Sequence, residues 1–255
     1  MRILVSFAIL WLLSTTAIAQ SRLNNDVKGI IYDREGAIEF RLHTHGWAIN
    51  YQIGKLKTYY RTNFYEFGLG ELKHYKETSK STDSPTGPTS TFRSYSFGKQ
   101  NYAFVLRGGL GFKRYYTEKA AKNGVAVGVT YAGGVTLALM KPYYLEIGGT
   151  RDFNSIPIKY SEATKKDFLD PFKIRGTGGL FDGVGETSII PGAYGRIGVQ
   201  VDWGAFDEFL RAVEVGIQLD VFPKKLPILV PVNGFDENRP YFLNFYLSLQ
   251  LGKRR

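Results

Sequence analysis

The sequence predicts an all-β protein, an antiparallel up-and-down transmembrane β-barrel of about ten strands, with eight as the alternative count. Apolar and polar residues alternate along most of the chain, which indicates strands with one apolar and one polar face. The 29 Gly, 17 Tyr and 18 Phe, with a mean hydropathy of -0.18, suit a barrel whose lipid-facing and lumen-facing residues average out. Long and short connections also alternate, as they do in outer-membrane barrels.

The N-terminal residues 1–19 are predicted to be a secretion signal, because Arg2 precedes an apolar run and Ala17-Ile18-Ala19 forms a small-x-small cleavage site. The chain contains no Cys, so sheet hydrogen bonding and burial must stabilise it without disulfide bonds. Residues 20–35 are expected to form a periplasmic lead-in. The barrel is expected to span residues 36–252.

The strands are assigned in chain order from the alternating runs. Ile38, Phe40 and Leu42 begin the pattern, and a tight turn at residues 44–46 joins this strand to the next in a hairpin. The final run has the roughly ten residues that a tilted membrane strand needs. The ten predicted strands are 36–42, 47–53, 65–70, 92–97, 102–107, 125–139, 143–147, 196–203, 213–221 and 240–252, of which the fourth has the weakest pattern.

The connections predict the orientation of the barrel, because outer-membrane barrels have long outer loops and short periplasmic turns. Both termini are therefore expected in the periplasm of a Gram-negative bacterium, where residues 253–255 form a basic tail. The predicted outer loops are 76–90, a moderate one at 116–123, 152–187 and 223–239, and the predicted periplasmic turns are 54–61, 98–100, 140–142 and 204–209.

Aromatic residues cluster where the strands should cross the membrane interfaces, the depth that amphipathic rings prefer. The expected inner belt is Tyr59, Tyr60, Tyr143, Tyr144 and Trp203, and the expected outer belt is Tyr115, Tyr116 and Tyr241. Alternation does not say which face of a strand lies inside, so a soluble lipocalin-like barrel with an apolar interior is an open alternative.

A polar face inside a membrane barrel would carry many charges. A small barrel is normally filled by its own side chains, so we expect these groups to form a salt-bridged plug. The expected members are Glu39, Arg41, Glu66, Arg107, Glu146, Arg196, Asp202, Glu214 and Asp220. A narrow polar pore is the alternative, favoured by the small Gly and Ala side chains of the strand at 125–139.

The histidines are the remaining candidates for chemistry. His43 and His45 have a spacing that can chelate a metal, but no third ligand is apparent and a solvated hairpin tip is the simpler interpretation. His74 could act as the general base of a lipid A deacylase or phospholipase, and Ser79 and Ser81 lie near it in the sequence. No nucleophile-elbow pattern accompanies these serines. We therefore expect no catalytic residues and no cofactor.

The charge pattern predicts partners. A formal net charge of +10 in an envelope protein favours lipopolysaccharide phosphates, other outer-membrane lipid or an acidic protein surface over nucleic acid as the partner. Basic loops that serve only solubility are the alternative. The predicted basic periplasmic rim consists of Lys55, Lys57, Lys99, Lys141, Lys253, Arg254 and Arg255.

The alternating strands and the closing run from Tyr241 to Leu251 resemble the small outer-membrane β-barrel-domain proteins of Gram-negative envelopes, particularly those of Bacteroidota. Such barrels often end on an aromatic residue, whereas Gly252-Lys253-Arg254-Arg255 follows the strand here. The sequence offers no catalytic set and a lumen expected to be plugged, while the loop 152–187 supplies contact surface. We therefore expect an integral, non-enzymatic structural or accessory subunit of an envelope complex, for secretion or outer-membrane assembly. A small diffusion pore and a lipid-modifying enzyme are the alternatives.

Overall fold

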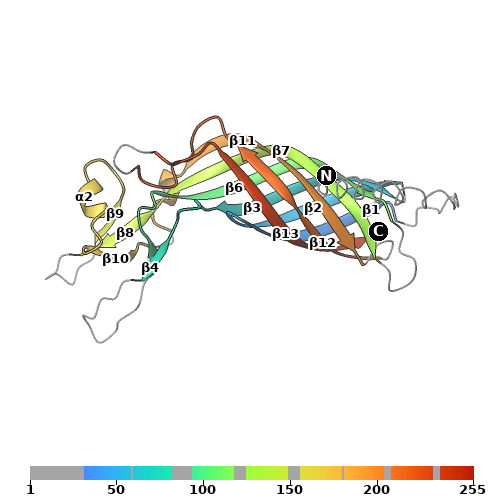
Figure 1. Ribbon diagram of the computed structural model, residues 1–255, viewed down its shortest axis with the longest axis horizontal. Coiled ribbons are helices and arrows are strands. Elements are labelled where there is room, and N and C mark those ends of the chain that lie inside the picture. The colour runs from blue at the N-terminus through green and yellow to red at the C-terminus, as the bar shows by residue number, and fades with distance from the viewer. Residues whose placement is uncertain are drawn as a thin grey trace, which may run out of the picture. The chain divides into compact units, whose positions relative to one another are not determined.

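The computed structural model describes residues 32–58, 60–81, 94–117, 125–148, 156–179, 181–203, 208–231 and 236–255. The predicted secretion signal and most of the predicted lead-in lie outside these residues. From Tyr32 to Arg255 the chain forms one compact unit, and its main feature is a closed barrel of eight antiparallel strands in the order β1-β13-β12-β11-β7-β6-β3-β2 (Figure 1). The predicted all-β, up-and-down barrel is therefore confirmed with the smaller of the two strand counts.

Every barrel strand hydrogen-bonds to two neighbours, so the sheet has no free edge. The barrel strands are β1 (Arg34–His43), β2 (Gly46–Thr58), β3 (Arg61–Leu72), β6 (Asn101–Tyr115), β7 (Ala126–Pro142), β11 (Ser188–Asp202), β12 (Phe209–Val221) and β13 (Tyr241–Arg254). The first and last strands close the barrel in an antiparallel register that runs from Glu35 opposite Arg254 to His43 opposite Tyr246.

The alternation along each strand separates an apolar exterior from a polar interior. On β1, Ile38, Phe40 and Leu42 are exposed, whereas Glu39 and Arg41 between them are buried. The same order holds on β13, β12 and β3. A continuous apolar outer surface with charges inside is the arrangement of transmembrane barrels. The lipocalin-like alternative, with its apolar face inside, is therefore wrong.

Two of the ten predicted strands leave the barrel. Residues 94–96 form β5 (Ser94–Ser96), which pairs only with β4 (Ser79–Ser81). Residues 144–147 form β8 (Tyr144–Ile147) in a three-stranded sheet with β9 (Ile156–Lys159) and β10 (Ile174–Thr177). The rest of the predicted 152–187 loop contains α2 (Lys165–Phe168) and the short 3-10 helix η1 (Val184–Glu186). No helix among the described residues is long and apolar enough to cross a membrane.

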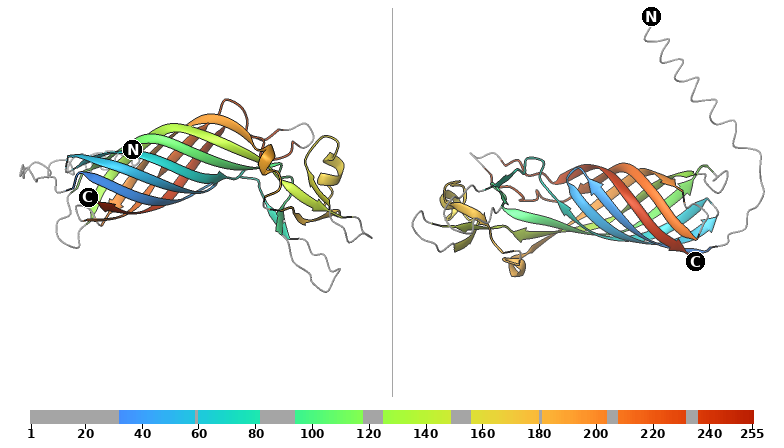
Figure 2. Two further views of the ribbon diagram at one scale, coloured as in Figure 1. Left: turned by 180° about the vertical axis from the view of Figure 1, so that it is seen from behind. Right: turned by 90° about the horizontal axis from the view of Figure 1, so that it is seen from below.

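The barrel has a terminal end, where both β1 begins and β13 finishes, and an opposite loop end, where β4, β5, β8, β9, β10 and α2 lie (Figures 1 and 2). Because β5 and β8 are outside the barrel, strands β6 and β7 run opposite to the predicted direction. Residues 98–100 and 140–142 therefore lie at the loop end, where the Tyr143 amide donates to Gln100 O at 2.9 Å. The connection after Tyr115 lies at the terminal end, where the Tyr115 amide donates to Tyr60 O at 2.9 Å.

The reversed direction of β6 and β7 also shows that the predicted aromatic belts are wrong in part. Tyr115 and Tyr116 lie with Tyr60 and Trp203 at the terminal end, whereas Tyr143 and Tyr144 lie with Tyr241 at the loop end. Two of these residues are not lipid-facing, because the Tyr115 ring is buried in the lumen and the Tyr143 ring is buried beyond the barrel. Tyr59 lies outside the described residues.

The small sheets at the loop end have a hydrophobic core of their own. Tyr143, Leu145 and Phe168 are buried in it, and Tyr95 of β5 joins them from the two-stranded ribbon. This core explains why the runs at 92–97 and 143–147 alternate like membrane strands. Alternation marks any sheet with one covered face, whether lipid or protein covers it.

The predicted basic tail is part of the last strand. Lys253 and Arg254 pair with Gly36 and Glu35 of β1, so the barrel begins before residue 36 and continues beyond residue 252. Arg254 points inward and is buried. The basic rim is also divided, because Lys99 and Lys141 lie at the loop end and Lys99 is buried in an ion pair with Glu77.

Candidate functional site: the barrel interior

The lumen is closed at the loop end by an apolar cap. The segment after β12 folds back so that Phe222, Leu226 and Ile228 are buried against Ala103 and Val105 of β6, and further apolar side chains from β3, β7, β11 and β13 complete the cluster. Asn238 fixes this segment, since its side-chain oxygen accepts hydrogen bonds from the amides of Ile228 and Leu229 at 3.0 Å each. The cluster therefore places buried apolar side chains at the loop end of the lumen.

Beneath the cap lies the first of three charged layers. Arg107 of β6 donates from Nε to Asp220 Oδ1 at 2.9 Å and from Nη2 to Asp220 Oδ2 at 3.2 Å. Gln218 donates to the same carboxylate at 2.8 Å. All three side chains are buried, so the charge of the arginine is neutralised by a partner on the opposite part of the barrel wall.

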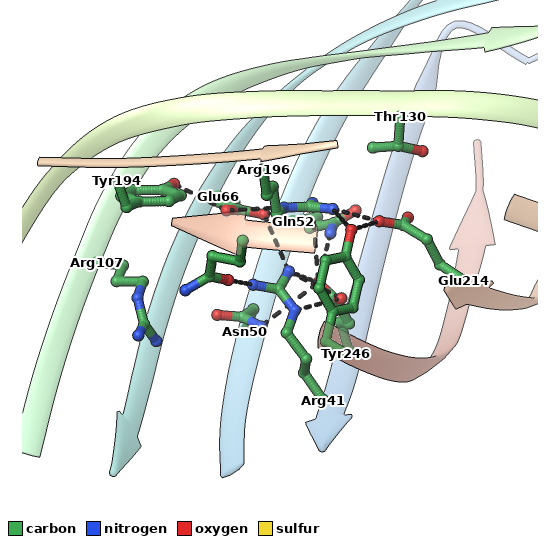
Figure 3. Close-up of polar contacts among 12 residues, drawn as sticks. Arg41, Asn50, Gln52, Glu66, Arg107, Thr130, Tyr194, Arg196, Glu214 and Tyr246 are labelled. Carbon is green, nitrogen blue, oxygen red and sulfur yellow. Dashed lines mark hydrogen bonds and ion pairs between the residues drawn. The ribbon is translucent and has the colours of Figure 1, made fainter. Parts of the chain in front are cut away.

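The middle layer is the largest polar network, and Figure 3 shows it around Arg41 and Arg196. Arg41 donates to both oxygens of Glu39, at 3.0 and 2.9 Å, and to Gln218 Oε1 at 2.6 Å. Arg196 donates to Glu66 Oε2 at 2.7 Å and forms a second ion pair with Glu214. The five charged side chains of this layer are each at most 1% exposed.

Neutral donors complete the middle layer. The Tyr194 hydroxyl donates to Glu66 Oε1 at 2.8 Å, and the Tyr246 hydroxyl donates to Glu214 (Figure 3). Gln52 donates to Glu39 Oε2 at 2.8 Å. Three carboxylates and two guanidinium groups are therefore held in fixed positions by side chains from several strands. Such a network is stable only when its members are satisfied together.

The third layer closes the terminal end and joins the first strand to the last. Glu35 of β1 receives hydrogen bonds from Lys113 at 3.0 Å and from Arg254 Nε at 2.9 Å. Arg254 Nη2 also donates to Asp202 Oδ2 at 2.9 Å, and the Tyr115 hydroxyl donates to the same atom at 2.7 Å. This layer spans β1, β6, β11 and β13, so it crosses the lumen.

The structure brings eight of the nine predicted lumen charges into these layers. Glu146 is the exception, because it lies in β8 outside the barrel. Sequence reasoning missed Glu35, Lys113 and Arg254, and it also missed the two tyrosines that bind Glu66 and Glu214. The two-residue alternation could have identified two of these residues. Lys113 is an even number of positions from the inward-facing Arg107, and Arg254 is an even number of positions from the inward-facing Gln250, so each lies on the lumen face of its strand.

The structure places the three histidines in different surroundings. His43 is buried in the lumen, whereas the His45 ring contacts Asn244 Oδ1 at 2.7 Å. The part of the chain that the structure describes holds no group of three or more His, Asp or Glu side chains placed to bind a metal ion. His74 Nε2 lies 3.3 Å from Glu237 O and Nδ1 accepts from the Lys76 amide, and burial lowers the pKa of this ring.

Of the two predicted serines, Ser79 is the one whose side chain the structure describes, and it does not contact His74. The Ser79 hydroxyl contacts Ser94 in the two-stranded ribbon instead. His74 in its neutral form therefore uses both nitrogens to hold the loop after β3 against the segment before β13. This is a structural role for the ring.

No protein-family model and no curated protein matches the chain. Among solved structures, the crystal structure of the N-terminal beta-barrel domain of Pseudomonas aeruginosa OprF is similar, with a TM-score of 0.35 and 9% sequence identity. That match covers 87% of this chain and 96% of the OprF chain.

Proposed function

We propose that this protein is an integral outer-membrane barrel that does not conduct, and that it anchors a folded loop-end platform as a structural or accessory subunit of an envelope complex, for secretion or outer-membrane assembly. The observation that carries the proposal is the closed lumen, in which an apolar cap and three charged layers fill the barrel from end to end. In a barrel filled in this way, the interior side chains stabilise the fold and leave no path for transport. Its function then depends on what it displays.

The apolar exterior supports the membrane location, because a band of exposed Ile, Leu, Val, Phe and Tyr side chains surrounds the barrel. The long connections after β3, β7 and β12 all leave from the loop end, which supports an orientation with this end outside the cell and both described strand termini in the periplasm. The lipid and the lipopolysaccharide of the outer membrane are then the immediate surroundings of the barrel.

The loop-end elements support a protein partner. The Phe172 side chain, between α2 and β10, is 98% exposed, and that of Phe181 is 82% exposed. Ile156 of β9 is also exposed. Large exposed apolar groups are typical of interaction sites, where a few aromatic residues contribute most of the binding energy. We propose that these three residues contribute to the docking face of the subunit.

Two measurements test the proposal. In planar bilayers the purified protein should give no conductance steps; steady steps would support the diffusion pore instead. A mild-detergent pull-down from the native outer membrane, with stoichiometry by mass spectrometry, should recover a stoichiometric protein partner.

Matched variants make the pull-down specific. Phe172→Ser combined with Phe181→Ser should lose the partner, whereas Lys166→Ser, an exposed change on the neighbouring α2, should retain it. A barrel that is purified alone, or a partner retained equally by all variants, would contradict the docking face. In that case lipid-product assays with His74→Ala would test the enzymatic alternative.

A further inference from the structure

The exterior of the barrel carries a groove where its first and last strands meet. The groove lies at the terminal end of β1 and β13, and its volume is about 550 Å³. Gly36 forms its floor, because this outward-facing position has no side chain. An ideal Cβ placed there would lie 3.5 Å from the Tyr51 hydroxyl, which is an ordinary contact, so the backbone itself does not require glycine.

One part of the groove is apolar. Toward the barrel centre it is walled by Ile38, Tyr51 and Leu251, and Ile53 lies beside the floor on β2. Each of these side chains is between 45% and 49% exposed, so they form part of the outer apolar surface that faces lipid. The register places Ile53 and Lys253 on either side of Gly36. An extended hydrocarbon chain fits this surface.

The other part of the groove is basic. Arg34, Lys253 and Arg255 line it, and Lys55 lies opposite Arg34 in the β1-β2 register. Two acids of the described residues pair with these cations. Asp33 is 3.9 Å from Arg34, and Glu208 is 2.7 Å from Lys253.

Glu35, which also borders the groove, does not offset these cations. Glu35 points into the lumen, where Lys113 and Arg254 neutralise it. The Arg34 side chain is 80% exposed, and the Lys253 side chain is 48% exposed. Both can therefore reach a ligand that lies on the outer surface.

We propose that this groove binds an anionic phospholipid, with an acyl chain over Gly36 and the phosphate among Arg34, Lys253 and Arg255. The order of the two parts matches the depth profile of a bilayer, because the apolar walls face the hydrocarbon and the cations lie at the barrel end, where headgroups are. Its volume lies in the range of small-molecule sites. This lipid site is separate from the protein docking face at the loop end and does not depend on it.

The test measures lipid retention. The purified barrel is reconstituted into mixed vesicles of phosphatidylglycerol and phosphatidylcholine. It is then extracted in mild detergent, and the lipids that remain bound are identified by native mass spectrometry. Wild type should retain phosphatidylglycerol in preference to phosphatidylcholine. Each cation removed by Arg34→Gln or Arg255→Gln should lower that retention about fivefold, the effect of one basic residue near an anionic surface.

Matched variants separate the groove from general lipid contact. Gly36→Leu fills the floor and should reduce phosphatidylglycerol retention to the level of phosphatidylcholine. Gly195→Leu is its control, because Gly195 faces outward on β11 with open space around it. Arg211→Gln removes an exposed arginine from β12 outside the groove and should leave retention unchanged.

Folding is checked by the gel mobility of unheated samples, and only variants with wild-type mobility are compared. Because all these substitutions are on the exterior, they leave the charged layers intact. Equal retention of the two lipids by wild type would overturn the proposal, and so would Gly36→Leu retaining as much phosphatidylglycerol as Gly195→Leu. Retention lost in Gly36→Leu and in the cation variants alone would establish the site.

Discussion

Replacing Arg196 with methionine tests the central claim that the lumen is a mutually dependent charge network. Arg196 is buried between Glu66 and Glu214, with its guanidinium 2.7 Å from the Glu66 carboxylate. At an effective dielectric constant of about 20, a charge pair at that distance contributes about 6 kcal/mol, and the desolvation of the arginine offsets several kcal/mol of it. The substitution leaves two carboxylates buried with too little positive charge. We therefore expect the free energy of unfolding to fall by about 3 to 5 kcal/mol.

The assay is urea unfolding of the barrel in lipid vesicles, followed by tryptophan fluorescence. Arg211→Met is the matched control, since it makes the same change on the lipid-facing side of β12 and should cost less than about 1 kcal/mol. A triple variant, Arg196→Met with Glu66→Gln and Glu214→Gln, should recover most of the loss because no uncompensated charge is left inside. The reasoning is refuted if Arg196→Met is no more destabilising than Arg211→Met.

Two further predictions concern the loop end. Leu226→Ala removes a fully buried side chain of the apolar cap and should lower the free energy of opening the cap by about 2 kcal/mol or more. Trypsin should then cleave at the adjacent lysines about thirtyfold faster. Leu229→Ala, at a half-buried position, should have a smaller effect. Burial lowers the pKa of His74 in the folded state below the unfolded value of about 6.5; the neutral ring therefore stabilises its loop above that pH, and this stabilisation is lost as the pH falls through the lower folded value. Hydrogen exchange at the Lys76 amide should show less protection at pH 5 than at pH 7.5, and His74→Gln should remove the difference.

The sequence predicted the barrel because an apolar outer face and a polar inner face impose a strict two-residue period on every strand. Each of the runs at 36–42, 47–53, 65–70, 102–107, 125–139, 196–203, 213–221 and 240–252 matches a barrel strand to within one residue beyond its ends. The strand count was overestimated because Leu145 and Tyr95 face a protein core instead of lipid, and the local pattern of a strand is the same in both cases. Only the pairing partners distinguish the two, and pairing is not encoded locally.

The interior was predicted in composition but not in connectivity. Parity alone places Arg107 and Asp220 inside, yet their hydrogen bond joins β6 to β12, which are not adjacent in the sheet. Such contacts depend on the stagger of the strands around the closed barrel. The lipid groove was hidden for a similar reason, because Gly36 and Lys253 are far apart in the chain and meet only when the barrel closes.

The Glu35–Arg254 pair also determines when the molecule becomes complete during folding. Its two residues are separated by 219 positions, so the contact forms only after the strands between them have found their neighbours. Until that contact forms, we expect β1 and β13 to be two unpaired edges of the sheet. Closure is therefore expected to be the slow step of assembly. Glu35→Gln should mainly accelerate unfolding, because it weakens a contact that forms after the rate-limiting barrier.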